Sequence, residues 1–228
     1  MESENTVVKL EEPHSLAGFI QQRRNFFIGL LVFVIAAIVV FFVIAGVQDA
    51  NTKKKLTALE DLIERYEKLA DSIEEEPSGT EVETLRFDLQ TFAEGARGYA
   101  GAKAWSLAGT VYSKQGKWAD AENAFMQSAE SGKKTHLYGP SLFNAGIAAE
   151  EANNIDKAIE YYTRSVGVPG TIIGARAQFS IGRLQEGKGD RDAARLAYRN
   201  VIDQYTDYSG DTWREFAQSR LIALDEGN

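Results

Sequence analysis

The chain has 228 residues, and its 33 Asp and Glu outnumber its 25 Lys and Arg, which gives a formal net charge of −8. We expect no nucleic-acid partner for so acidic a chain, because contacts to phosphate need clustered Lys and Arg. There is no cysteine, which excludes disulfides, thiolate metal sites and a cysteine nucleophile.

The N-terminal region divides into a polar tail and an apolar segment. We expect residues 1–24 to be a tail and residues 25–47 to form a transmembrane helix, because the run from Phe26 to Val47 contains no charged residue. At about 1.5 Å per residue, a helix of this length crosses the roughly 30 Å hydrocarbon core of a bilayer. The lipid bilayer is therefore the expected partner of Phe26–Val47, and the chain is expected to be a single-pass membrane protein.

Two alternatives for this segment stay open. A cleaved signal peptide is the competing interpretation, and Val43-x-Ala45 is a tolerable cleavage pattern. The apolar core of a signal peptide is normally only about 7–15 residues, however, which favours an uncleaved anchor. The orientation is nearly balanced by charge, since Arg23 and Arg24 precede the segment and the lysines at 53–55 follow it.

Residues 48–100 are expected to form a divergent helical hairpin. Apolar side chains three and four residues apart predict a helix over 53–76. The Pro-Ser-Gly sequence at 77–79 is expected to end this helix. Thr80 is expected to cap the next helix, with Glu83 in the reciprocal position of a capping box.

The apolar stripe of the first of these helices has two interpretations. Its spacing from Leu56 to Ile73 suits a coiled-coil homodimer, but it covers fewer than three heptads. A helix that faces the protein's own core is the simpler interpretation, and homodimerisation stays possible.

From Gly101 onward the sequence repeats with spacings of 37 and 36 residues. A turn residue marks each repeat: Gly116, Asn153 and Gly189. Another glycine lies seven residues before each turn: Gly109, Gly146 and Gly182. In the helix that follows each turn, an aromatic residue comes four residues after an alanine: Phe125, Tyr162 and Tyr198. Such a period predicts stacked helical hairpins, in which small residues let paired helices approach and the aromatic rings fill the space beside them.

The first unit resembles the tetratricopeptide repeat, whose pattern is W-x₂-L-G-x₂-Y…A-x₃-F. It reads Trp105-Ser-Leu-Ala-Gly109-Thr-Val-Tyr112 and then Ala121-Glu-Asn-Ala-Phe125. The second unit keeps four of the expected residues, Leu142, Gly146, Ala158 and Tyr162. The third is degenerate, with Gln178 and Gln185 where large apolar residues are usual.

The resemblance implies an all-α fold in which one transmembrane helix precedes a tetratricopeptide-type helical-hairpin solenoid. Residues 101–210 would form three such units, and residues 211–228 would form a C-terminal capping helix. The groove of such a solenoid is lined by the first helix of each unit.

The whole layout is similar to that of the YfgM-like proteins, which are ancillary subunits of the bacterial Sec translocon. The similarity lies in the tail, the single span, the divergent hairpin, the repeats and the terminal helix, together with Leu89-Gln-Thr-Phe-Ala-Glu before the first repeat. It implies a protein of the bacterial inner (cytoplasmic) membrane whose C-terminal domain is periplasmic. It also implies contacts with the Sec translocon and with periplasmic chaperones.

Alignment to the repeat pattern predicts which side chains face the groove. The candidate partner-binding residues are Lys103, Ser106, Thr110, Phe143, Asn144, Ile147, Arg176, Phe179 and Arg183. Ser113, Glu150 and Ser180 occupy further groove-facing positions.

Two binding modes are considered for this groove. Some members of the repeat family hold a partner's C-terminal carboxylate with Lys and Asn, but Ser106 and Thr110 leave that clamp incomplete here. The alternative is a mixed groove, in which Phe143 and Phe179 offer apolar contact and the arginines bond to an acidic segment. Against both stands the simpler possibility that the two Phe rings pack between neighbouring helices.

Nothing in the sequence indicates an enzyme, a metal site or a cofactor. The two histidines, His14 and His136, lie in different parts of the chain without a ligand-type cluster. We therefore expect a membrane-anchored scaffold for protein–protein interactions at the cell envelope, and the resemblance to the YfgM-like proteins implies that it links the Sec translocon to chaperones. An adaptor that organises envelope assembly or the cell wall is the alternative, and an unrecognised envelope enzyme or solute-binding module is a second one.

Overall fold

The computed structural model describes residues 23–206 and 210–226, so most of the predicted tail lies outside the described residues. The chain divides between Lys54 and Lys55 into two compact units. All regular structure in the described residues is helical. The predicted all-helical fold is confirmed for this part of the chain.

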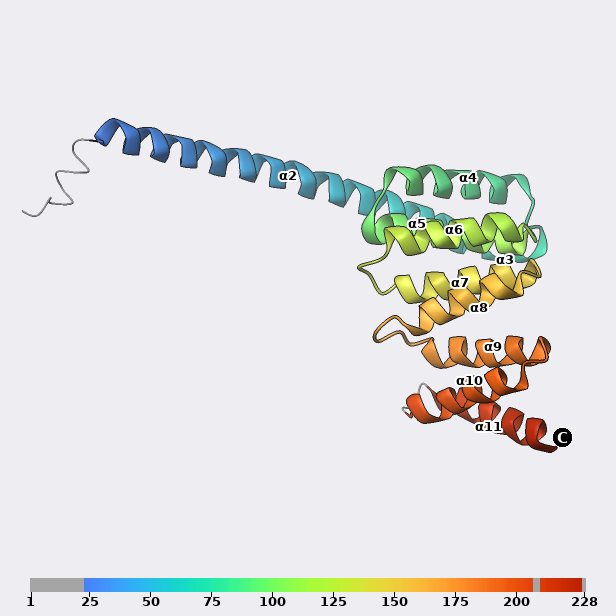
Figure 1. The fold of residues 1–228 in the computed structure, drawn as a ribbon. Coiled ribbons are helices and arrows are strands. Elements are labelled where there is room, and N and C mark those ends of the chain that lie inside the picture. The colour runs from blue at the N-terminus through green and yellow to red at the C-terminus, as the bar shows by residue number, and fades with distance from the viewer. Residues whose placement is uncertain (1–22, 207–209, 227–228) are drawn as a thin grey trace, which may run out of the picture. The chain divides into compact units, whose positions relative to one another are not determined.

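The first unit contains the N-terminal part of helix α2, which begins at Arg24 and ends at Lys68 (Figure 1). Its segment Arg24–Phe42 has no buried residue and is long and apolar enough to cross a membrane, by length and composition. The apolar helix that the sequence predicts is therefore present. Its insertion into a membrane stays a prediction.

The second unit is a stack of antiparallel helices in chain order, as Figure 1 shows from α4 onward. After the last turns of α2 come the short α3 (Ala70–Glu75) and α4 (Thr80–Gly95). The hairpins then follow as α5 (Gly98–Lys114) with α6 (Trp118–Ser131), α7 (Tyr138–Glu151) with α8 (Ile155–Val166), and α9 (Gly174–Gly187) with α10 (Arg191–Gln204). Helix α11 (Asp211–Glu226) packs on α10 and α9.

The glycines of the repeat mark the closest approach within each hairpin. A Cβ atom on Gly109 would lie 2.8 Å from the ring of Phe125. On Gly146 and Gly182 it would lie 2.6 Å from the rings of Tyr162 and Tyr198. These distances are shorter than any normal carbon–carbon contact, so only glycine leaves room for the ring. The predicted pairing of small residue and aromatic is confirmed in all three units.

The turn inside each hairpin has one geometry in all three units. Gly116, Asn153 and Gly189 adopt left-handed backbone conformations, with φ of 68°, 58° and 80°. The next amide then bonds back to the carbonyl five residues earlier, at 2.8–3.0 Å: Lys117 to Tyr112, Asn154 to Ala149 and Asp190 to Gln185. This is the Schellman C-cap, for which Gly and Asn are the favoured residues.

The helix that precedes the repeats packs into the protein's own core. Leu59, Leu62 and Ile73 are buried together with apolar side chains of α4 and α5. The stripe is therefore used within the chain, which favours the core-facing interpretation over a coiled coil. Leu56 is the large apolar residue at its start that stays exposed.

Two local predictions for this hairpin are wrong. The helix expected over 53–76 is interrupted at Leu69, which separates α2 from α3 and lets Ile73 turn into the core. Thr80 is the first residue of α4 and not its cap, since Gly79 holds that position without a side-chain bond. Glu83 does not reach back to the cap, because its carboxylate binds Arg86 at 2.8 Å and Lys117 at 3.1 Å.

Candidate protein-binding groove

The candidate site lies along the first helices of successive hairpins, α7, α9 and α11. Side chains join these helices directly. Arg176 and Arg183 of α9 reach Phe143 and Glu150 of α7, and Arg220 of α11 reaches Glu186 of α9. We call this surface the groove.

The predicted groove residues on α5 offer little to a partner. The Thr110 hydroxyl donates to the Ser106 carbonyl at 3.0 Å, and the Ser113 hydroxyl donates to the Gly109 carbonyl at 2.9 Å. Both hydroxyls are therefore used by their own helix. Lys103 is half-buried. The structure gives no support for a complete carboxylate clamp on α5.

The predicted residues on α7 are mostly part of the core. Phe143 is only 3% exposed, and its ring lies 5.2 Å from that of Tyr162. Ile147 packs against the buried apolar cluster that contains Phe143 and Tyr162, and Asn144 is half-buried. Phe143 therefore packs between helices and leaves little apolar surface for a partner.

The predicted residues on α9 are the ones that reach solvent. Arg176 and Arg183 are exposed and Phe179 is half-buried, whereas Ser180 is buried. The Arg176 guanidinium stacks over Phe143 at 4.9 Å and over Trp213 at 5.7 Å. The aromatic faces hold the cation in place.

Two charged clusters repeat along the groove. In the first, Glu150 accepts hydrogen bonds from the Tyr162 hydroxyl at 3.0 Å and from Arg183 at 2.7 Å. In the second, Glu186 accepts from the Tyr198 hydroxyl at 2.9 Å and from Arg220. Each cluster ties a second helix and the next first helix to one carboxylate, so it fixes the spacing between hairpins.

The first repeat, formed by α5 and α6, lacks this arrangement. The positions that correspond to tyrosine, glutamate and arginine are occupied by Phe125, Ser113 and Ile147. None of these side chains carries a charge, so these positions of the junction between α5 and α7 lack the ion pair that the later junctions have.

The acid–base properties of the second cluster follow from its contacts. Burial raises the pKa of Tyr198 to about 12, and its hydrogen bond to Glu186 acts in the same direction. Burial also tends to raise the pKa of Glu186, but the bonds from Arg220 and Tyr198 outweigh it and hold the pKa below its ordinary value. The phenol thus stays a donor and the carboxylate stays charged at neutral pH.

Four aromatic rings gather beside the second cluster. The ring of Phe179 lies 5.4 Å from Tyr198, 5.5 Å from Trp213 and 6.1 Å from Phe216. Phe179 and Tyr198 also line a cavity of about 480 Å³, which we call the cleft. Its other lining residues are Arg183, Glu186, Gly187 and Arg220. A space of this size, with apolar walls and fixed charges, suits one side chain of a partner.

Sequence reasoning did not select Trp213, Phe216 and Arg220. All three lie on α11, which was expected only to cap the stack. The signal was available, since Phe216 follows Phe179 by 37 residues and Arg220 follows Arg183 by 37. Extending the repeat alignment by one helix would have placed them in the groove.

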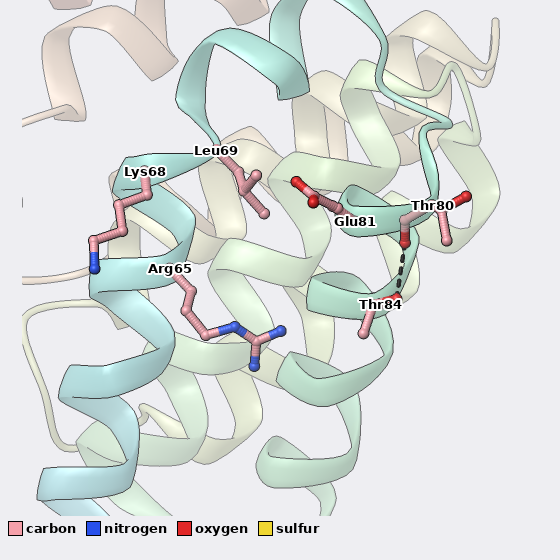
Figure 2. A pocket seen from close by; sticks show the side chains of 6 residues that line it. All are labelled: Arg65, Lys68, Leu69, Thr80, Glu81 and Thr84. Carbon is pink, nitrogen blue, oxygen red and sulfur yellow. Dashed lines mark hydrogen bonds between the residues drawn. The ribbon is translucent and has the colours of Figure 1, made fainter.

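A second cavity, of about 380 Å³, lies between the end of α2 and the start of α4. Figure 2 shows Lys68 extending away from Thr80 and Glu81. Arg65 is paired with Asp88 at 2.8 Å and Lys68 with Glu64 at 2.5 Å, so both cations are already engaged. The cations of this cavity are therefore already paired, and Glu81 is the other charged residue of its lining.

Within the described residues, no group of three or more His, Cys, Asp or Glu side chains is placed to hold a metal ion. His136 is exposed, and its ring lies 5.6 Å from that of Tyr99. His14 lies outside the described residues.

Helices α5–α10 thus form a helical-hairpin solenoid of the tetratricopeptide type, a class that binds other proteins. Two family models described as tetratricopeptide repeat match residues 101–168 and 176–208. The chain is also similar to a TPR repeat-containing protein of Treponema pallidum (strain Nichols), with 29% identity over 130 residues. That match covers 57% of this chain and 53% of the relative, so the chain spans about half the length of the curated relative it matches.

Proposed function

We propose that the protein is a membrane-anchored scaffold of the bacterial cell envelope that binds partner proteins through the groove. The observation that carries the binding role is the surface formed by α9 and α11. There the exposed Arg176 stacks on Trp213, and the half-buried Phe179, which lines the cavity of about 480 Å³, contacts the exposed Phe216. Aromatic residues, phenylalanine included, and arginine are enriched at protein–protein interfaces.

The anchoring role is supported by the first unit. Segment Arg24–Phe42 has no buried residue, and it exposes large apolar side chains that include Phe26, Phe33 and Phe42. Exposed in water, a surface of this kind would drive aggregation, whereas in a bilayer it is the stable arrangement. The unit that carries the groove would then be tethered to the membrane by the same chain.

The finer proposal concerns the partners. The similarity of layout to the YfgM-like proteins favours the Sec translocon and periplasmic chaperones, with the groove on the periplasmic side of the inner membrane. Protease accessibility of the C-terminal unit in intact spheroplasts tests the orientation. A unit that is protected there and is cleaved only after lysis would remove the periplasmic proposal.

Site-specific photo-cross-linking in cells tests the binding role. The photoreactive p-benzoylphenylalanine replaces Phe216, an aromatic position in the groove that is 49% exposed. Leu196 on α10, which is 62% exposed and belongs neither to the ring cluster of Phe179, Trp213 and Phe216 nor to the lining of the cleft, is the matched control. We expect discrete cross-linked proteins from position 216 and none of them from position 196. The same products from both positions, or none from either, would contradict a groove that binds partners.

Identification of the cross-linked proteins tests the finer proposal. Translocon subunits or periplasmic chaperones are the expected products. Recovery of cell-wall or outer-membrane assembly factors instead would favour the envelope-organising alternative, since it uses the same fold and groove.

A further inference from the structure

The three arginines of the groove differ in their partners. Arg183 is paired with Glu150, and Arg220 is paired with Glu186. Arg176 stacks between the rings of Phe143 and Trp213, and no carboxylate of the described residues lies within ion-pair distance of it. Its hydrogen-bond donors are thus held at the protein surface without an anionic acceptor.

The position of Arg176 relative to the cleft is fixed by helix α9. Arg176, Phe179 and Arg183 follow one another at spacings of three and four residues, so they lie on one face of the helix. Arg183, which lines the cleft, lies seven positions beyond Arg176 on α9, a rise of about 10 Å. An extended chain covers that distance in about three residues.

We propose that this end of the groove binds an extended acidic segment of a partner protein, with a carboxylate on Arg176 and an apolar side chain, about three residues away, in the cleft beside Phe179. This inference rests on the proposed function and adds the chemistry of the partner.

The charges of the groove favour an acidic occupant over a basic one. A guanidinium offers a planar pair of donors that matches a carboxylate, and its stacking on aromatic rings leaves those donors free at the edge. A basic segment would face Arg176 without compensation. It would also have to compete with Arg183 and Arg220 for the two carboxylates, Glu150 and Glu186, which are already bonded.

The apolar part of the recognition rests on the cleft and on the aromatic rings next to Phe179. The rings of Phe179, Trp213 and Phe216 lie within 5.5–6.1 Å of one another. Phe216 is 49% exposed, although Phe143, its counterpart on α7, is only 3% exposed. The reason is that α9 covers Phe143 with Arg176, whereas no described helix covers Phe216. An apolar side chain of a partner would supply the missing contact.

Fluorescence anisotropy with the full chain in lipid nanodiscs tests the proposal. The probe is a short labelled peptide with an aspartate and a leucine three residues apart. Matched peptides carry asparagine or lysine in place of the aspartate, or serine in place of the leucine. We expect the Asp–Leu peptide to bind most tightly and its affinity to fall as salt is added, because an exposed ion pair is screened.

The protein variants identify the site. Arg176→Gln is expected to weaken the Asp–Leu peptide about tenfold, by loss of a charge-assisted bond, and to leave the asparagine peptide unchanged. Arg176→Lys keeps the charge but loses the planar pair of donors, so it should give an intermediate affinity. Arg199→Gln, at an exposed arginine on α10, is the matched control and should change nothing. Thermal melting of each variant shows that the unit is folded.

Three results would overturn the proposal: equal affinity for the aspartate and asparagine peptides, full affinity in folded Arg176→Gln, or no binding of any peptide. The cross-linking experiment at position 216 is independent of all three. If partners cross-link there while the acidic peptides fail, only the acidic chemistry is lost. If position 216 yields no partner, the proposed function itself fails.

Discussion

Gly146 shows how one missing side chain sets the geometry of a hairpin. The ring of Tyr162 occupies the place where a Cβ atom would lie, at 2.6 Å. Because the tyrosine is also bonded to Glu150, it cannot move aside without breaking that bond.

We therefore predict that Gly146→Ala destabilises the protein by about 1–3 kcal/mol, the usual cost of an overpacked core. Urea denaturation followed by tryptophan fluorescence measures the change. The matched control is Gly95→Ala at the end of α4, where a Cβ atom meets nothing within 4 Å. The control should be neutral or slightly stabilising, since alanine favours the helix. Equal effects at the two positions would contradict the steric explanation.

Glu186 links the stability of the stack to pH. Its pKa lies below the ordinary 4.5, because hydrogen bonds from Arg220 and Tyr198 outweigh the effect of burial. A carboxyl whose pKa is lowered on folding contributes stability above its unfolded pKa, and this contribution is lost as the pH falls through the folded pKa. The loss on acidification should therefore begin near pH 4.5 and continue below it.

The prediction is that Glu186→Gln flattens the fall of unfolding free energy between neutral pH and about pH 3. Chemical denaturation at a series of pH values measures it. Glu151→Gln, at an exposed acid on α7, removes the same charge and should keep the wild-type slope. If both variants show the wild-type slope, the Glu186 cluster does not contribute to acid stability.

At the scale of elements, the turn within each hairpin determines how its two helices reverse. The left-handed conformation of Gly116, with φ of 68°, allows the amide of Lys117 to bond to the Tyr112 carbonyl at 3.0 Å. We predict that Gly116→Ala costs about 1–2 kcal/mol, since alanine is strained in that conformation. Gly116→Asn should cost less, because Asn153 has the same role in the second hairpin. Thermal unfolding compares the two variants, and an equal loss in both would contradict the role of φ.

The features whose positions recur with the repeat period could be predicted from the sequence. The features that depend on contacts between distant parts of the chain could not. The pairing of Gly182 with Tyr198 is encoded in local spacing, so the sequence predicts it. The interruption at Leu69 depends on where Ile73 must lie in a core shared with α4 and α5. The predicted capping box of Thr80 and Glu83 fails for a similar reason. The Glu83 carboxylate binds Lys117, which lies 34 residues further along the chain.

The groove was predictable in part for the same reason. Repeat alignment located Arg176, Phe179 and Arg183, because their positions follow from the period. It left open whether Phe143 faces a partner or packs between neighbouring helices, and the second alternative is the correct one. The choice depends on how closely α7 and α9 approach, which the repeat pattern does not specify. The α11 residues were missed because the helix lacks the motif residues of the repeat.

At the scale of the whole molecule, two kinds of surface are combined in one chain. The segment Arg24–Phe42 has no buried residue and exposes mainly apolar side chains, whereas the second unit carries most of the acidic residues and buries most of its apolar side chains in three clusters. A chain of this composition is expected to partition between lipid and water by segment, which is the physical basis of the anchored scaffold.

That partition can be tested by placing charge in the apolar helix. We predict that the double variant Ile35→Arg, Val39→Arg moves the protein from the membrane pellet to the soluble fraction, because each arginine at the centre of a bilayer costs about 2.5–3.5 kcal/mol. Alkaline carbonate extraction followed by immunoblotting measures the distribution. Leu196→Arg is the control, since it adds a charge at an exposed apolar residue of α10 and should leave the protein in the pellet. A double variant that stays in the pellet after extraction, or a wild-type protein that is released by it, would show that this segment does not anchor the chain in lipid.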